Sequence, residues 1–89
     1  MDKLLFNPVR LKIMSTLLSV DNCDFKYLKT ITEATSGNLS IQIKKLKEKK
    51  YIRVKKTFEN NYPKTKCKVT EKGKNCFEKF FQDLQSYKI

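Results

Sequence analysis

The chain has 89 residues, which is enough for one domain with a modest core. No apolar run approaches the roughly 20 residues of a membrane span and no signal-peptide pattern opens the chain, so we expect a cytoplasmic protein without a membrane partner. Histidine is absent and the three cysteines share no metal-ligand spacing, so we expect neither a metal site nor another cofactor.

The net charge of +11 is concentrated in the middle of the chain. Residues 35–70 hold eleven basic and two acidic groups, whereas residues 1–34 hold five and four, and residues 71–89 hold four and three. A surface that binds a polyanion concentrates charge in this way, and a merely solubilising surface spreads it. We therefore expect double-stranded DNA as the partner of the region that residues 35–70 build.

Two helices are predicted before this basic region. Asn7 and Pro8 form a helix start, and the helix runs to about Val20. Its apolar residues cover more than half of the circumference, which favours a subunit interface as a second burying surface. After a turn, Asp24 is the expected N-cap of a second helix that ends near Glu33.

A third helix begins near Ser36 and forms a helix-turn-helix pattern with the second. Leu39, Ile43 and Leu46 make one apolar stripe at helical spacing, so the other side faces solvent or a partner. Asparagine and glutamine can bond adenine, lysine can bond guanine, and an isoleucine can touch a thymine methyl. The predicted base-reading residues on the outer side are Ser36, Asn38, Ile41, Gln42 and Lys45. The alternative is a solvated helix face, against which an exposed isoleucine counts.

From Tyr51 the apolar period changes from 3.6 to 2, which predicts two strands joined by a turn over Glu59–Pro63. Lys56 interrupts the apolar side of the first strand. Lysines on the outer side are expected to contact phosphates, which position a protein without reading sequence. For any single lysine, simple solubilisation is an equal alternative. The predicted backbone and wing contacts are Lys44, Lys49, Lys55, Asn60, Asn61, Lys64, Lys66 and Lys68.

Thr70 and Glu71 open a last helix that is expected to reach about residue 88. Its aromatic flank exceeds what a small core needs, so the terminal helices, about 5–20 and 71–88, are predicted to form a dimer interface. The residues assigned to this interface are Leu4, Leu5, Phe6, Phe77, Phe80, Phe81, Leu84 and Tyr87. Cys76, beside this flank, could act as a redox switch near its symmetry mate, but an inert buried thiol is the favoured reading.

The order helix, helix, helix, strand, strand, helix predicts a single winged helix-turn-helix domain over residues 1–89, mostly α with a small antiparallel β-hairpin. The segments NPVRLKIMSTL, TSGNLSIQIKKLKEKKYIRVKKTF and PKTKCKVTEKGKNCF resemble the small winged-helix transcriptional regulators related to the MarR and ArsR families. The resemblance runs from about Phe6 to Leu84 and is most specific at residues 37–40 and 70–73. It implies a homodimer with the third helix in the major groove and the wing on the flanking backbone or minor groove. Gln42 departs from the histidine that these proteins often carry, which affects base preference.

We therefore expect a homodimeric, sequence-specific transcriptional regulator associated with the nucleoid. An enzyme is not expected, because the chain has no histidine, no nucleophile elbow and no glycine-rich phosphate loop. Two alternatives stay open. The first is an architectural protein that coats DNA without reading bases. The second is a protein-interaction module whose basic face meets an acidic partner.

Overall fold

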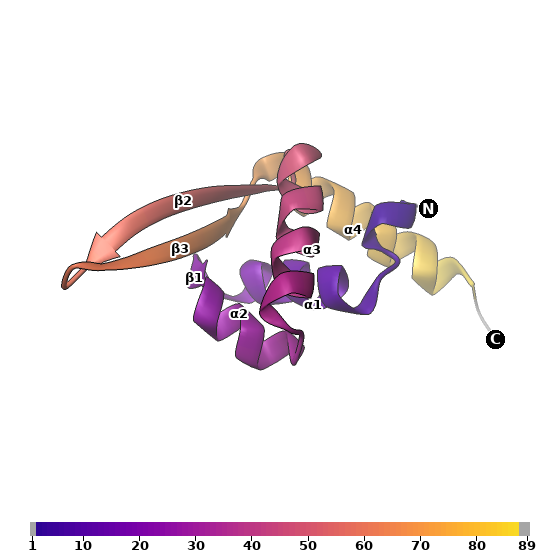
Figure 1. Cartoon of the computed structure of the whole chain (residues 1–89). Coiled ribbons are helices and arrows are strands. Elements are labelled where there is room, and N and C mark those ends of the chain that lie inside the picture. Colours follow the sequence, from indigo (N-terminus) through magenta and orange to yellow (C-terminus); the bar gives the residue numbers. More distant parts are fainter. Residues whose placement is uncertain (1, 88–89) are drawn as a thin grey trace.

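The computed structural model describes residues 2–87 and has the winged helix-turn-helix architecture that the sequence predicts (Figure 1). A short 3-10 helix precedes the helix, helix, helix, strand, strand, helix order, and one additional short strand lies between the first two helices. The elements are η1 (Lys3–Leu5), α1 (Pro8–Ser19), β1 (Cys23–Asp24), α2 (Phe25–Thr32), α3 (Ser36–Glu48), β2 (Ile52–Glu59), β3 (Tyr62–Val69) and α4 (Glu71–Ser86).

Side-chain caps decide where the four α-helices begin. The Asn7 side chain accepts hydrogen bonds from the backbone amides of Val9 and Arg10, both at 3.0 Å. Asp24, Thr35 and Thr70 cap α2, α3 and α4 in the same way. These caps satisfy amides that have no partner within their helix. The predicted starts of the helices are thus confirmed. At the other end, α4 stops at Ser86, and residue 88, its expected end, lies outside the described residues.

The sheet has three strands in the order β1-β3-β2, one more than the expected hairpin. The additional strand, β1, pairs antiparallel with β3 and places Cys23 opposite Cys67. The turn of the wing is also tighter than the predicted Glu59–Pro63. Strands β2 and β3 pair as far as Glu59 and Tyr62, so Asn60 and Asn61 alone make the turn, at φ values of 51° and 66°. Asparagine tolerates these left-handed values, and such two-residue turns match the twist of a hairpin.

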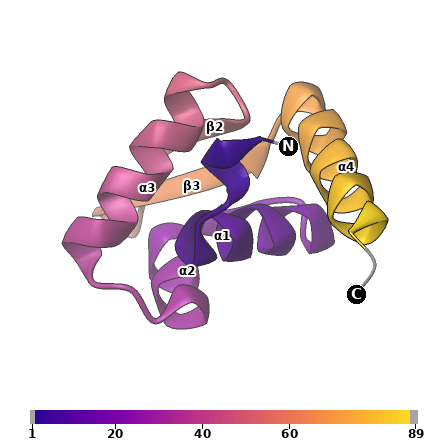
Figure 2. The same ribbon diagram turned by 90° about the vertical axis from the view of Figure 1, so that its right-hand side faces the viewer.

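Helix α1 lies at the centre of the domain. It contacts η1, α2, α3, β3 and α4, and Figure 2 shows it passing between α3 and α4. Ile13, Met14 and Leu17 are buried, while Leu18 and Val20 at the C-terminal end are exposed. The broad apolar circumference of α1 is therefore used mainly inside one protomer. A subunit interface along this helix stays a prediction.

Tyr51 joins the wing to both ends of the chain. Its hydroxyl donates a hydrogen bond to the Asp2 carboxylate, and its carbonyl oxygen accepts from the amide of Thr70 at 2.9 Å and from the Thr70 hydroxyl at 3.0 Å. Burial, and then the Asp2 interaction, raise the pKa of this phenol above its usual value. The base of the wing is thus tied to η1 and to α4.

Among residues 2–87, no helix is both long and apolar enough to cross a membrane.

Candidate nucleic-acid interface

Helix α3 presents one buried side and one open side. Leu39, Ile43 and Leu46 pack in the core, as the apolar stripe predicts. Ile41 is 54% exposed on the open side, where it offers an apolar contact. Four of the five predicted base readers are exposed, namely Ser36, Asn38, Ile41 and Lys45. These four side chains are thus accessible, and what they contact stays a prediction.

Gln42, the fifth predicted reader, does not face outward. Its residue is only 8% exposed, and its side-chain oxygen accepts a hydrogen bond from the Arg10 guanidinium. Its side-chain nitrogen donates to Asn38 Oδ1 at 2.9 Å. The expected outward orientation of Gln42 is wrong, because α1 brings an arginine against this side of α3. No sequence signal near residue 42 indicates Arg10, which lies 32 positions away.

A groove of about 510 Å³ separates α3 from the inner face of the wing. It is lined by Phe25 of α2, Ser40, Ile43, Lys44 and Lys47 of α3, and Val54, Lys56 and Thr65 of the sheet. Three ammonium groups therefore border a concave surface that also offers two hydroxyl groups. Such a groove suits a phosphate backbone that runs beside a helix in the major groove.

Two of the three groove lysines, Lys47 and Lys56, are absent from the predicted contacts. Lys56 breaks the apolar alternation of β2, and the register places it opposite Thr65 on the inner face of the hairpin. That break in alternation was the sequence signal that could have indicated a role for Lys56. The sequence showed that Lys56 shares a face with Val54, but only the packing of α3 shows that this end of the face is an open groove.

The other face of the wing carries half of the predicted backbone contacts. Arg53 is paired with Lys68, and Lys55 with Lys66, across β2 and β3. Because side chains alternate along a strand, this face points away from the groove that contains Lys56. The predicted phosphate contacts therefore do not share one surface. Lys44 lies in the groove, Lys49 is exposed just after α3, Asn60 and Asn61 are exposed at the tip, and Lys55, Lys64, Lys66 and Lys68 lie on the outer face.

Ion pairs neutralise part of that outer face. Lys64 Nζ lies 2.9 Å from one Glu59 oxygen, and Lys66 Nζ lies 3.1 Å from the other. These lysines lower the pKa of the Glu59 carboxyl below its usual value. Lys68 lies 3.6 Å from Asp21. Three of the lysines predicted to contact DNA thus already have acidic partners, whereas residues 2–87 supply no salt bridge to Lys44, Lys47 or Lys56.

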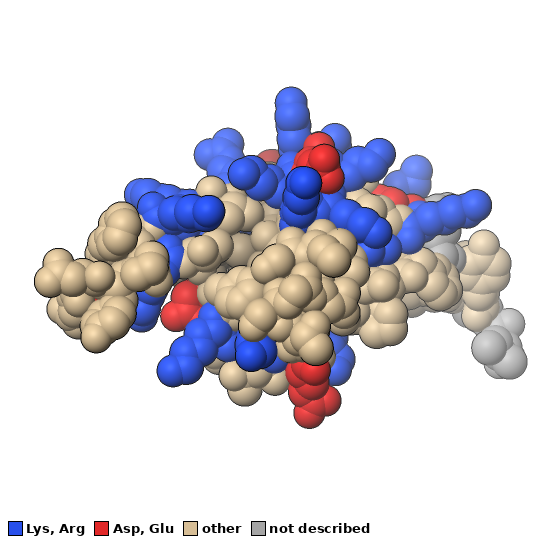
Figure 3. Space-filling view, viewed as in Figure 1, with Lys and Arg blue, Asp and Glu red and all other residues tan. Residues whose placement is uncertain are grey.

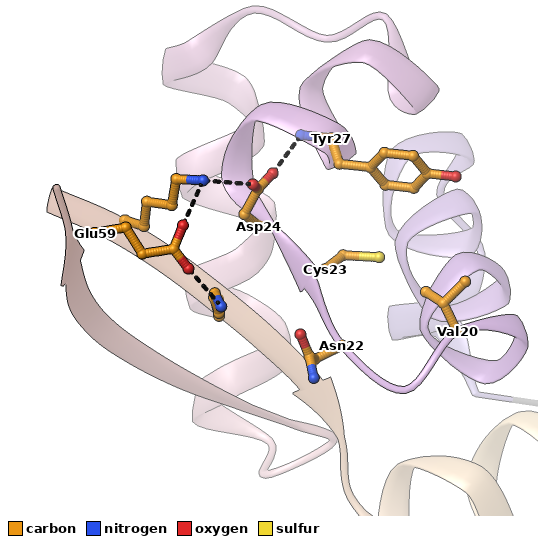
Figure 4. A pocket seen from close by; sticks show the side chains of 8 residues that line it. Val20, Asn22, Cys23, Asp24, Tyr27 and Glu59 are labelled. Carbon is orange, nitrogen blue, oxygen red and sulfur yellow. Dashed lines mark hydrogen bonds and ion pairs between the residues drawn. The ribbon is translucent and has the colours of Figure 1, made fainter. Parts of the chain in front are cut away.

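A pocket beside the wing is lined by residues that link the sheet to α2 (Figure 4). Asp24 accepts from the Tyr27 amide at 2.8 Å as the N-cap of α2, and it lies 3.8 Å from Lys64. Glu59 holds the same lysine. Burial raises the pKa of the Cys23 thiol, so this thiol is a weak nucleophile. The charged groups here link the wing to the start of α2.

Basic side chains gather on one side of the molecule. Figure 3 shows lysine and arginine along its upper edge, over the C-terminal half of α3 and the base of the wing. Lysines in the last turn of a helix also interact favourably with its dipole, so part of this cluster stabilises α3 itself. The tip of the wing differs, because Phe58 and Tyr62 are both exposed there. Tyr62 thus does not pack under the turn.

The predicted dimer-interface residues divide into a buried and an exposed group. Leu5 is fully buried and Phe80 is 2% exposed, so both belong to the core of the protomer, and their assignment to a subunit interface is wrong. Leu4, Phe77 and Leu84 are partly buried against that core. Phe6, which packs edge-on against Phe80 with ring centroids 6.0 Å apart, stays 65% exposed. The exposed members are Phe6, Phe81 and Tyr87.

Known proteins match the chain along nearly its whole length. The family profile described as the winged helix DNA-binding domain matches residues 9–88. An uncharacterized protein of Methanocaldococcus jannaschii is 34% identical over 82 residues, which is 92% of this chain and 89% of that protein. A transcriptional regulator homologue from Pyrococcus horikoshii OT3 superposes with a TM-score of 0.88 at 28% identity, over 96% of this chain and 84% of that one. The reduced transcriptional regulator YodB from B. subtilis has a TM-score of 0.76 at 23% identity, over 96% and 81%, and this likeness shows the fold alone.

Proposed function

We propose, from the premise that the chain belongs to the winged helix DNA-binding domain family, that it is a homodimeric, sequence-specific regulator of transcription that binds double-stranded DNA. In this proposal α3 enters the major groove and the wing follows the flanking backbone or minor groove. The protein then works in the compartment that holds chromosomal DNA, the cytoplasm of a cell with a nucleoid. The regulatory role is further supported by the fold shared with the Pyrococcus horikoshii regulator homologue.

The observation that carries the proposal is the juxtaposition of the open side of α3 with the groove beside it. Ile41 and Asn38 offer an apolar and a polar contact to base edges. Lys44, Lys47 and Lys56 border the groove in which a phosphate strand would run. In this proposal the side chains that read bases and the lysines that bind phosphates are both carried by α3 and the groove beside it, as sequence-specific binding requires.

Dimerisation is proposed through the C-terminal half of α4 and the segment before α1. Phe6, Phe81 and Tyr87 are exposed large apolar residues near the chain ends, and Leu84 is partly buried. Exposed aromatic side chains of this kind are typical of surfaces that bind other proteins. A two-fold dimer would present two α3 helices to half-sites about 34–36 Å apart on one side of the DNA.

Selection from a random duplex library, followed by footprinting, tests this function. We expect a two-fold symmetric site protected over two adjacent major grooves. The triple variant Asn38→Ala, Ile41→Ala, Lys45→Ala should lose preference for that site but keep weak binding to any duplex. The variant Lys74→Ala, Asn75→Ala on the exposed surface of the N-terminal half of α4 removes one positive charge and one amide away from α3, and it should keep the preference. A preference unaltered in the triple variant would reject the assigned surface.

A second candidate, an architectural DNA-binding protein, is favoured by the number of lysines on α3 itself. Lys44, Lys45 and Lys47 are all exposed, and lysine contacts with phosphates carry no sequence information. The same selection distinguishes the two candidates. An architectural protein would enrich no sequence, and its affinity for selected and random duplexes would be equal.

A further inference from the structure

We propose that Arg10, acting through Gln42, holds the amide of Asn38 so that it offers hydrogen to DNA, and that Asn38 therefore reads guanine and not adenine. This inference rests on the function proposed above and assigns a base preference to one residue of that surface. Asn38 is the contacting residue, whereas Arg10 and Gln42 are positioning residues. It also replaces the adenine contact that the sequence predicts for Asn38.

The direction of the hydrogen bonds follows from the chemistry of Arg10. A guanidinium has only donors, so the group of Gln42 that faces it must be the side-chain oxygen. The nitrogen of Gln42 then faces Asn38, and its hydrogen can only be received by Asn38 Oδ1, at 2.9 Å. The Arg10 guanidinium thus orients the side-chain amide of Gln42, which in turn orients that of Asn38. The bond from Gln42 takes one of the two lone pairs of Asn38 Oδ1, and the amide nitrogen of Asn38, which is not bonded to Gln42, is the donor left for DNA.

The network is anchored away from the DNA-binding surface. Arg10 also donates from Nε to the carbonyl oxygen of Leu4, just before α1, and the backbone amide of Arg10 is bonded to Asn7 at 3.0 Å. Gln42 is 8% exposed and therefore largely shielded from competing water. In contrast, Asn38 is exposed at the outer end of the network. A buried, directional chain of bonds therefore ends at the exposed amide of Asn38, whose nitrogen is not bonded to Gln42.

The base preference follows from the edges that the major groove presents. Bidentate binding of adenine by asparagine uses the amide oxygen to accept from N6 and the amide nitrogen to donate to N7. Here Asn38 Oδ1 is turned toward Gln42, so the adenine N6 hydrogens would face the amide hydrogens instead. Guanine offers two acceptors, O6 and N7, and suits a donor. We expect guanine to be preferred over adenine by about 5- to 10-fold at one position of each half-site.

The substitution Gln42→Glu tests this assignment with almost no change in shape. The introduced carboxylate still accepts from Arg10, but it cannot donate to Asn38. It instead accepts from the Asn38 nitrogen, which turns the Asn38 oxygen toward the DNA. We expect the guanine preference to reverse in favour of adenine or cytosine, whose edges carry a donor. Asn75→Asp, on the exposed surface of the N-terminal half of α4, makes the same change in charge and should keep the preference for guanine.

Binding is measured by fluorescence anisotropy on duplexes that differ at one base pair per half-site, and each preference is a ratio within one variant. Retention of the wild-type ratio in Gln42→Glu would overturn the inference and leave the proposed function intact. Failure of the wild type to distinguish any sequences would overturn the proposed function itself. In the free protein, NMR should show slower hydrogen exchange for the Gln42 side-chain amide than for that of Asn38. The opposite order would refute the network without any DNA.

Discussion

A Cβ atom at Gly73 would lie 2.1 Å from the carbonyl oxygen of Tyr51. The first turn of α4 therefore packs directly against the backbone that begins the wing, at a distance that no other residue permits. The Tyr51 oxygen cannot easily retreat, because it accepts two hydrogen bonds from Thr70. Glycine at this position sets the angle between α4 and the wing through close contact and not through a special backbone conformation.

Gly73→Ala is expected to destabilise the protein by about 1–3 kcal/mol, the range for overpacking at a site that cannot relax. Urea denaturation followed by circular dichroism measures this change. The control is Gly37→Ala in α3, where an added Cβ meets nothing within 4 Å. There alanine should be neutral or should stabilise the helix by up to about 1 kcal/mol. Equal effects of the two substitutions would contradict the close contact at Gly73.

Lys56→Ala is expected to weaken DNA binding and to reduce the slope of log affinity against log salt by about 1 for each subunit, because one phosphate contact is lost. Lys68→Ala on the outer face of the wing is the comparison, since this lysine already lies 3.6 Å from Asp21. It should change the slope less. Titrations at several salt concentrations measure both slopes. A larger effect of Lys68→Ala would mean that the outer face, and not the groove, meets DNA.

The pKa of the Glu59 carboxyl should lie below its usual value of 4.5, because Lys64 and Lys66 stabilise the ionised form. A group with a lowered folded pKa adds stability above its unfolded pKa and loses it as the pH falls through the folded pKa. The ion pairs of the wing should therefore be complete above about pH 4.5 and disappear in stronger acid. Carboxyl-carbon NMR follows the titration. The double substitution Lys64→Ala, Lys66→Ala should return the midpoint toward 4.5, and an unchanged midpoint would argue against these ion pairs.

The three cysteines are expected to react with a thiol reagent at different rates. Burial raises the pKa of Cys67 to about 11, so about one thiol in a thousand is ionised at pH 8. Cys23 is also buried, with a raised pKa, whereas Cys76 is partly exposed. Cys76 should be labelled first and Cys67 last, as mass spectrometry of peptides would show. In 6 M guanidinium chloride the three rates should become similar. Early labelling of Cys67 in the folded protein would contradict its burial.

Phe81→Lys is expected to weaken the proposed dimer by at least about tenfold, because it places a charge in an apolar interface. Sedimentation equilibrium measures the dissociation constant. Ile31→Lys, at an exposed apolar residue of α2, makes a comparable change away from α4 and should leave association unaltered. A wild-type protein that stays monomeric at tens of micromolar would contradict the dimer.

Residues that act within a few positions of one another were predictable. Asn7, Asp24 and Thr70 cap their helices because each side chain reaches amides two or three residues ahead. The alternation in β2 and β3 likewise distinguished the inner from the outer face of the hairpin. For the candidate site, the same local spacing indicated that Asn38 and Ile41 are exposed.

Residues whose role depends on a distant partner were not predictable. Gln42 has the spacing of a residue at the edge of the apolar stripe, and only Arg10 of α1 makes its burial acceptable, since a buried amide must be hydrogen-bonded. In the sequence, Lys56 only interrupts the apolar alternation of β2. In the structure, α3 forms the other wall of a groove that Lys56 borders. Leu5 was assigned to a subunit interface, although η1 folds back and buries it in the protomer.

The amino-acid sequence by itself determined the order of the helices and strands, the helix starts, and the concentration of charge on α3 and the wing. These features depend on the periodicity of apolar residues and on hydrogen bonds between residues that are close together in the sequence. The tertiary structure alone decided which way the Asn38 amide is turned, which lysines line the groove, and why residue 73 must be glycine. Each of these depends on atoms that are far apart in sequence and brought within a few ångströms only by the packing of α1, α3 and α4 around one core.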